Sequence, residues 1–278
     1  MRYFFDNCDK IKKELADKNI FLFLDYDGTL TPIVKKPELA KLDSQIKKLL
    51  RKISRNCPTA IISGRPLNEI EKLVGLKNII YSGNHGFEIE TQITADDTKC
   101  HSESRKKRDN LREQSRRLPQ IFVQIEARKI KPIIQKIRYV LEKKIKNIKG
   151  AFVENKGLTL SIHWRLVDKK NLLNLFAIIR ETIRNNSRVR LTKGKKVWEI
   201  RPNIIWDKGK AVQWILSLLP TSYSLCPIYI GDDTTDEDVF KVLKNGITIR
   251  IRKSKKSKAR YYLKKQSEIK KLLNHLIA

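Results

Sequence analysis

Residues 20–29 read Ile-Phe-Leu-Phe-Leu-Asp-Tyr-Asp-Gly-Thr. The five apolar residues that open this stretch predict a strand covered on both faces, which is typical of a parallel sheet. Two carboxylates, Asp25 and Asp27, follow at the point where the strand ends. Side chains at positions i and i+2 of an extended chain point the same way, so both carboxylates can face one ligand.

The chain around this stretch alternates between strand and helix patterns. In the first part, the predicted elements are a strand at 59–62, a strand at 78–81, and helices at 43–53 and 67–74. In the last part, helices are predicted at 207–219, 234–243 and 267–276, and strands at 227–230 and 247–251. This alternation predicts an α/β fold with a doubly wound parallel sheet.

The middle of the chain follows a different pattern. A helix at 132–146 and a hairpin at 151–165 are followed by a helix at 166–184 and a second hairpin at 189–201. Helix, two strands, helix, two strands predicts a separate α+β layer. We therefore expect a core formed by residues 1–104 and 204–278, with an inserted α+β domain at 105–203.

Composition sets limits on location and partners. The 278 residues include 60 Lys and Arg against 30 Asp and Glu, a net charge of +30. Such a charge attracts nucleic acid, anionic membranes or phosphorylated metabolites, although basic runs such as 105–117 and 250–265 are more often solvated surface. No apolar run approaches the roughly 20 residues of a membrane helix. Acids in the first nine residues argue against a signal peptide, so we expect a cytoplasmic protein with no membrane span.

Three more polar motifs stand where predicted strands end or predicted helices begin. Ser63 follows the strand at 59–62, Lys208 opens a helix, and the acids of residues 232–236 follow the strand at 227–230. Taken singly, each has an ordinary structural explanation as a helix cap, a solvated lysine or an acidic turn. Taken together, they lie where open α/β sheets bind ligands.

The combination fits phosphoryl transfer. A carboxylate can attack phosphorus, and a second carboxyl group can protonate the leaving oxygen and then activate water. Clustered acids repel one another, and a divalent cation bound by their oxygens would relieve that cost. A lysine and a hydroxyl at a helix start would hold the phosphate oxygens.

The four motifs, in this order, resemble those of haloacid dehalogenase-like (HAD-like) phosphatases, whose core is Rossmann-type. The resemblance implies that Asp25 is the nucleophile and Asp27 the general acid/base, while Ser63 and Lys208 contact the phosphoryl group. It also implies a Mg²⁺ site. Its ligands would be Asp25, the backbone carbonyl of Asp27 and Asp232, with Asp233 and Asp236 as outer members.

A narrower resemblance, to trehalose-6-phosphate phosphatases, covers almost the whole chain. It rests on residues 24–30, 62–65, 83–86, 153–156, 161–165, 199–202, 206–210 and 231–238. One departure is Trp164, where many relatives carry tyrosine. The resemblance implies that the inserted domain is a mobile cap that closes over the sugar. The implied sugar contacts are Glu154, Lys156 and Glu199 on the cap and Arg65, Asn84 and His85 on the core. Further polar cap residues that suit a disaccharide are His163, Arg165 and Arg201.

The implied activity is Mg²⁺-dependent hydrolysis of trehalose 6-phosphate through an aspartyl-phosphate, in trehalose biosynthesis. We expect a monomer that acts on a small molecule and has no specific nucleic-acid partner. Two alternatives stay open. One is the same chemistry on another sugar phosphate, such as sucrose 6-phosphate or a glycosyl phosphoglycerate. The other is a basic nucleic-acid-binding protein on an inactive HAD fold, which the charge of +30 motivates.

Overall fold

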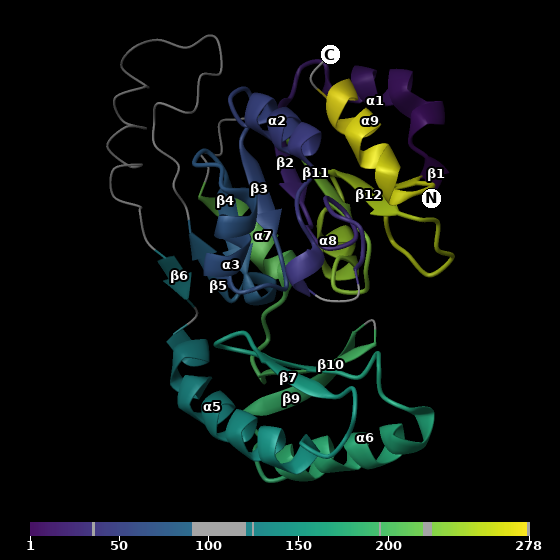
Figure 1. Cartoon of the computed structure of the whole chain (residues 1–278). Helices are drawn as coiled ribbons and strands as arrows, with labels where there is room; N and C mark the ends of the chain where they lie inside the picture. The colour runs from purple at the N-terminus through teal and green to yellow at the C-terminus, as the bar shows by residue number, and fades with distance from the viewer. Residues whose placement is uncertain (35–36, 91–120, 124, 195, 219–223, 277–278) are drawn as a thin grey trace. The chain divides into compact units, whose positions relative to one another are not determined.

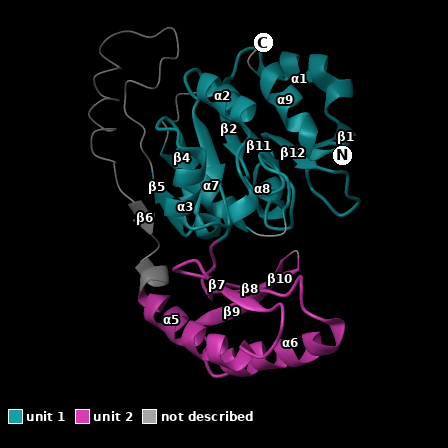
Figure 2. Ribbon diagram, viewed as in Figure 1, with its two compact units in different colours: residues 1–122, 207–278 teal, residues 123–206 magenta. Residues whose placement is uncertain are grey.

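The chain divides into two compact units, which Figure 2 shows in different colours. The computed structural model describes residues 1–34, 37–90, 121–123, 125–194, 196–218 and 224–276, and only the backbone of 121–128. Unit 1 comprises Met1–Phe122 and Asp207–Ala278, and unit 2 comprises Val123–Trp206. The predicted limit between residues 104 and 105 and the basic run 105–117 lie outside the described residues, so the domain limits stay a prediction.

Unit 1 is built on a mixed sheet in the order β1-β13-β12-β11-β2-β3-β4-β5-β6 (Figure 1). The strands are β1 (Arg2–Tyr3), β2 (Asn19–Leu24), β3 (Thr59–Ile62), β4 (Ile80–Gly83), β5 (Glu88–Glu90), β6 (Ile121–Val123), β11 (Leu225–Gly231), β12 (Ile247–Ile251) and β13 (Tyr261–Leu263). In the order of the sheet, the seven strands from β1 to β4 run parallel to one another, whereas β5 is antiparallel to β4. The predicted α/β fold class is confirmed.

The opening apolar run forms β2, near the centre of the sheet. Its side chains alternate between the two faces, and both faces are covered, because the whole of residues 21–24 is buried. Leu22 and Leu24 belong to a core cluster that also includes residues of α2, α3 and α9. Phe21 and Phe23 stack on each other, with ring centroids 4.3 Å apart. This double burial explains why the strand is apolar at every position.

The helices of unit 1 follow the amphipathic segments of the sequence. They are α1 (Cys8–Leu15), α2 (Ser44–Ile53), α3 (Leu67–Val74), α7 (Lys208–Ser217), α8 (Glu237–Val242) and α9 (Ile269–His275). Figure 1 shows α2 and α9 side by side. The Asp43 carboxylate caps α2 by accepting from the amides of Gln45 and Ile46, and Asp207 caps α7 by accepting from the amide of Lys210. The cap at Asp207 fixes the place where α7 begins, and so the position of Lys208.

The strand order reverses direction next to β2. The following strand, β3, pairs with one edge of β2, and β11 pairs with the other edge. In open α/β sheets this switch point leaves a crevice at the carboxyl ends of the strands, where ligands bind. Asp25 and Asp232 directly follow the two strands that meet there.

Unit 2 is a four-stranded antiparallel sheet in the order β7-β8-β10-β9. Its strands are β7 (Phe152–Asn155), β8 (Leu160–His163), β9 (Val189–Gly194) and β10 (Val197–Pro202), and its helices are α5 (Ile125–Ile145) and α6 (Lys169–Ile183). Alternate strand residues, such as Ile162 and Ile200, pack with apolar residues of the two helices. The other face of the sheet carries polar side chains. The predicted order of helix, two strands, helix, two strands is confirmed.

Several elements differ from the sequence prediction. β4 begins at Ile80, two residues later than predicted, and α8 begins at Glu237 because Asp233 holds the preceding residues in a turn. α5 extends from Ile125 through Pro132, although a proline is more typical of a helix start.

The short edge strand β1 and its short neighbour β13 were not predicted. β13 lies within the basic run 250–265, and its Tyr261 and Leu263 are buried. Part of this run is therefore core rather than solvated surface.

Among the described residues, no helix has both the length and the apolar character that crossing a membrane requires.

Candidate active site

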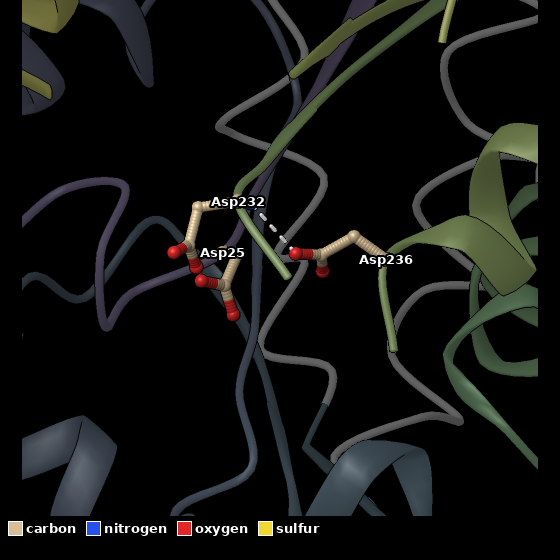
Figure 3. Close-up of side chains that lie close together, drawn as sticks. All are labelled: Asp25, Asp232 and Asp236. Carbon is tan, nitrogen blue, oxygen red and sulfur yellow. Dashed lines mark hydrogen bonds between the residues drawn. The ribbon is translucent and has the colours of Figure 1, made fainter. Parts of the chain in front are cut away.

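Three carboxylates meet at the carboxyl ends of β2 and β11. Asp25, Asp232 and Asp236 each offer an oxygen, and these oxygens lie within 4.8 Å of one another (Figure 3). The parallel ladder between β2 and β11 brings the first two together, since the amide of Asp25 donates to the carbonyl of Ile230 at 2.9 Å. Asp236 reaches the cluster from the end of the following loop, where its carboxylate accepts from the amides of Asp232 and Asp233.

The carboxylates of Asp232 and Asp236 occupy space that is open only because Gly28 and Gly231 have no side chain. A Cβ atom on Gly28 would lie 2.4 Å from the Asp232 carboxylate, and one on Gly231 would lie 2.3 Å from that of Asp236. Gly28 also has a φ of +93°, a conformation that disfavours other residues. The motif glycines thus have a direct physical role, because any side chain there would displace an acid of the cluster.

Lys208 provides the positive charge of the cluster. Its Nζ donates to Asp25 Oδ1 at 2.7 Å and to Asp236 Oδ1 at 2.8 Å, and its side chain is only 2% exposed. The Tyr229 hydroxyl also donates to Asp236 Oδ1, at 2.7 Å. One buried ammonium is therefore shared between two carboxylates that come from distant parts of the chain.

The pKa values show an excess of negative charge. Burial raises the pKa of Asp25 well above its ordinary value, because desolvation and the nearby acids outweigh the attraction of Lys208. Burial would also raise the pKa of Asp236, but Lys208 and the hydrogen bonds that Asp236 accepts lower it below the ordinary value. Burial alone would lower the pKa of Lys208, yet Asp236 and Asp25 raise it well above normal. The single lysine thus does not offset both the burial of Asp25 and the acids around it.

These residues fit a hard divalent cation. Carboxylate oxygens are the preferred protein ligands of Mg²⁺, and Asp25 and Asp232 each offer one here, while each Asp236 oxygen already accepts two hydrogen bonds. The raised pKa of Asp25 is the shift that a nearby cation would reverse. Asp233 is not in this group; its Oδ1 accepts from the amide and hydroxyl of Thr235 and from the amide of Asp236.

The loops after β3 and β4 bring four more of the predicted residues together. The Ser63 carbonyl accepts from the amide of His85 at 2.9 Å, and the amide of Asn84 donates to the Arg65 carbonyl at 2.7 Å. Asn84 and His85 both have positive φ values, 49° and 58°, and both are buried. Backbone strain of this kind costs about 1–3 kcal/mol per residue and is concentrated at functional sites.

Asp27 is held by Arg65. Arg65 Nε donates to Asp27 Oδ2 and Nη2 donates to Oδ1, each at 2.7 Å. The Arg65 side chain is 5% exposed, whereas that of Asp27 is 42% exposed. Asp27 therefore presents an anchored carboxylate at the edge of the site.

In unit 2, polar residues form a network on the sheet face opposite the helices. Glu154 and Glu199 both lie beside Ser161 across the strands, and the Ser161 hydroxyl donates to Glu199 Oε1 at 3.1 Å. Lys156 Nζ donates to the same Glu199 oxygen at 3.2 Å, and Arg201 donates to Glu199 Oε2 through Nε at 2.9 Å and through Nη2.

Glu154 forms the second part of this network. His163 Nε2 lies 2.7 Å from Glu154 Oε2, and the His163 ring stacks on Phe152. Arg165, also predicted here, lies in the turn after β8 and is half-buried. Both acids are thus held in place by neighbouring side chains of the same face.

Several residues that shape these sites were not predicted from the sequence. Tyr229 lies within an apolar strand, and only packing brings its hydroxyl to Asp236. Glu69 accepts from Arg65, and Glu88 accepts from the side chain of Asn84. For Ser161 a signal existed, since alternation in β8 places it on the polar face between two predicted acids.

Comparison with known proteins identifies the class first. The fold matches a solved HAD-like hydrolase from Bacteroides thetaiotaomicron with a TM-score of 0.59 at 14% identity, covering 93% of this chain and all of that one. A crystal structure of a trehalose-6-phosphate phosphatase related protein matches with a TM-score of 0.75 at 23% identity, covering 92% of this chain and 96% of that one. The protein therefore has the fold of HAD-like hydrolases.

The family follows from the sequence comparisons. The trehalose-phosphatase family model matches residues 23–267. Trehalose-phosphate phosphatase B of Arabidopsis thaliana is 37% identical over 97% of this chain and 69% of its own length. A probable trehalose-phosphate phosphatase 3 of Oryza sativa subsp. japonica is 38% identical over 94% of this chain and 70% of its own length. The chain belongs to the trehalose-phosphatase family, as its motifs predicted.

Proposed function

We propose that the protein hydrolyses trehalose 6-phosphate to trehalose and phosphate, with Mg²⁺, through an aspartyl-phosphate on Asp25. The observation that carries the proposal is the buried contact of Asp25 with Lys208 and its proximity to Asp232 and Asp236. A carboxylate held beside an ammonium can approach a phosphate that would otherwise repel it. The names of the relatives support the choice of substrate.

The proposed reaction has two steps, and Asp25 and Asp27 act in both. Asp25 attacks phosphorus while the bond from phosphorus to the sugar oxygen breaks, and Asp27 gives its proton to that oxygen. Water then attacks phosphorus and loses a proton to Asp27, so the bond to Asp25 breaks and phosphate leaves. Ser63 and Lys208 bind the phosphoryl oxygens throughout.

The acidic cluster supports a Mg²⁺ site. Its ligands would be Asp25, Asp232 and the Asp27 carbonyl, with Asp236 and Asp233 supporting them. When bound, Mg²⁺ offsets the negative charge of the phosphate and the attacking carboxylate. Lys208 remains necessary because it orients the Asp25 oxygen that it contacts.

The polar face of unit 2 supports recognition of the sugar. Glu154, Lys156 and Glu199 would accept from or donate to sugar hydroxyls, with His163, Arg165 and Arg201 around them. On the core, Asn84 and His85 would contact the substrate. Binding groups of this kind discriminate strongly against a sugar that leaves them unpaired. Sucrose 6-phosphate and a glycosyl phosphoglycerate also carry a phosphate group. Their sugar hydroxyls would make different hydrogen bonds with the polar face of unit 2.

The test is phosphate release from trehalose 6-phosphate, sucrose 6-phosphate and glucose 6-phosphate, with Mg²⁺ or with EDTA. We expect a strong preference for trehalose 6-phosphate, activity lost in EDTA, and recovery when excess Mg²⁺ is added. Equal weak release from all three would contradict the proposed substrate. Undiminished release in EDTA would contradict the metal requirement.

A further inference from the structure

The contacts of Arg65 assign it a role that differs from the sugar contact predicted from the sequence. Its guanidinium carries five N–H donors. Nε and Nη2 bind both oxygens of Asp27, Nη1 donates to Glu69, and Nη2 also donates to the Pro37 carbonyl at 2.9 Å. Four of the five donors are thus used within the described part of unit 1, and one remains for a substrate.

The packing around Arg65 makes this arrangement rigid. The guanidinium carbon lies 5.5 Å from the centroid of the Tyr26 ring, and the side chain is almost entirely buried. The backbone is fixed as well, since the Arg65 amide donates to Ser63 Oγ and its carbonyl accepts from the amide of Asn84. Arg65 is therefore held by the loops after β3 and β4, whereas Asp27 follows β2.

A bidentate pair of this kind fixes the plane of a carboxylate as well as its position. Each Asp27 oxygen keeps a further lone pair that the arginine does not use. A general acid must lie within hydrogen-bond reach of the oxygen that it protonates, and small misplacements are costly. We propose that Arg65, supported by Glu69, is a positioning residue that orients the Asp27 carboxyl toward the leaving oxygen. The inference rests on the proposed function, in which Asp27 is the general acid/base.

The choice of leaving group separates this role from the alternatives. A sugar departs as an alkoxide that must be protonated, whereas p-nitrophenyl phosphate releases a stable phenolate without an acid. In Arg65→Gln we expect kcat with trehalose 6-phosphate to fall on the order of 10²-fold, with KM nearly unchanged. The first-turnover burst of p-nitrophenolate should persist, followed by slow turnover because Asp27 must still activate water. Asp27→Asn should give the same pattern.

Three further variants make the test specific. Arg65→Lys keeps the charge but loses the two-pronged contact, so we expect it to behave like Arg65→Gln. Glu69→Gln removes one support and leaves the contact with Asp27, so the same pattern should appear with a fall of a few-fold. Arg55→Gln, at an exposed arginine of unit 1, is the matched control and should leave turnover of both substrates unchanged. Glu69→Gln also keeps the test valid if Arg65→Gln fails to fold.

Two results would overturn the proposal. A raised KM with unchanged kcat in Arg65→Gln would restore the predicted sugar contact. A merely structural role would reduce the p-nitrophenolate burst and sugar-phosphate turnover equally. This result would have to appear both in Arg65→Gln and in the folded Glu69→Gln. The proposed function fails separately, if the wild-type protein releases no phosphate from any phosphorylated sugar. A simple alkyl phosphate then supplies the poor leaving group for the same comparison.

Discussion

The two polar regions of this molecule are built on opposite principles. The cluster at the carboxyl ends of β2 and β11 is buried and short of positive charge, with three carboxylates around one lysine. The face of the unit 2 sheet is only partly buried, and its two acids pair with Lys156 and Arg201, while His163 Nε2 lies beside Glu154. An unbalanced buried cluster suits chemistry on a charged group and a cation, whereas a balanced network suits neutral hydroxyl groups. The comparison predicts that changes in the first region abolish turnover and that changes in the second alter substrate preference.

The largest effect is expected at Asp25. Asp25→Asn removes the attacking oxygen, and losing a nucleophile costs on the order of 10⁴-fold or more in kcat. The loss should be the same for trehalose 6-phosphate and for p-nitrophenyl phosphate, since the chemistry at phosphorus is shared. Steady-state assays on both substrates measure it, with circular dichroism to check the fold. Asp17→Asn, at an exposed aspartate of unit 1, should keep full activity. Turnover retained by Asp25→Asn would break the assignment of the chemistry to this region.

The next effect concerns stability. Lys208→Gln leaves Asp25 and Asp236 buried without their shared cation, and breaking a buried ion pair costs about 3–5 kcal/mol. Because the pKa of Asp25 is already raised, protonation can relieve part of this cost, so we expect a value near the lower end. The free energy of unfolding from urea denaturation measures it.

Lys241→Gln is the matched control for that experiment. Lys241 is exposed, and its Nζ lies 3.6 Å from an oxygen of Asp238, so the loss should not exceed about 1 kcal/mol. Equal small losses in both variants would show that the cluster does not depend on Lys208 for its charge balance.

A smaller effect is expected on the face of unit 2. His163→Ala removes the partner that holds Glu154 at 2.7 Å. Loss of one hydrogen bond of ordinary strength should raise KM for trehalose 6-phosphate about threefold to tenfold, with kcat for p-nitrophenyl phosphate unchanged. Lys170→Ala, at an exposed lysine of α6, is the control. A large loss of kcat on both substrates would place His163 in the chemistry and remove the distinction between the two regions.

The smallest expected effect is on the pH dependence of stability, and it arises at Glu71, away from the carboxylate cluster. Burial, with a hydrogen bond and the charge of Glu90, raises the pKa of Glu71 on α3 to about 7. The folded state therefore binds this proton more tightly than the unfolded state. The contribution is fully present below the unfolded pKa, near 4.5, and is lost as the pH rises through about 7. In the wild-type protein, the urea midpoint should fall as the pH rises from 4.5 to 8. In Glu71→Gln, the part of this fall that comes from Glu71 should be absent. An unchanged slope would mean that the pair Glu71–Glu90 does not share a proton.

The sequence allowed prediction of those parts that depend on local pattern. The strand before Asp25, the acids after β11 and the cap that places Lys208 each combine a strand end or helix start with a particular residue type. Parallel strand ends meet at one edge, so their proximity could be inferred without coordinates. The alternation of residues 159–164 likewise predicted a strand of unit 2, whereas the shared face of Glu154 and Glu199 follows from the strand register.

Residues that act through tertiary packing could not be predicted in the same way. Tyr229 occupies an apolar strand, and nothing in that pattern indicates that its hydroxyl reaches Asp236. The contact between Arg65 and Asp27 joins two loops whose relative geometry depends on the whole sheet. β13 was missed because its lysine- and arginine-rich surroundings obscured the buried Tyr261 and Leu263. Charge density along the sequence was a poor guide where a short strand lies between basic turns.

The most direct test of the two-region account is the ratio of kcat/KM for trehalose 6-phosphate to kcat/KM for p-nitrophenyl phosphate in Glu199→Gln. Glu199 is buried and accepts from Lys156, Ser161 and Arg201, so the substitution changes its charge with little change in volume. The matched control is Glu181→Gln, at an exposed glutamate of α6. The account predicts a ratio at least about tenfold lower than in the wild-type protein, since hydrogen bonds to charged groups contribute about 1.5–3 kcal/mol. The value for p-nitrophenyl phosphate should not change. An unchanged ratio, whether both values fall together or neither falls, would contradict the division between a chemical region and a sugar-selecting region.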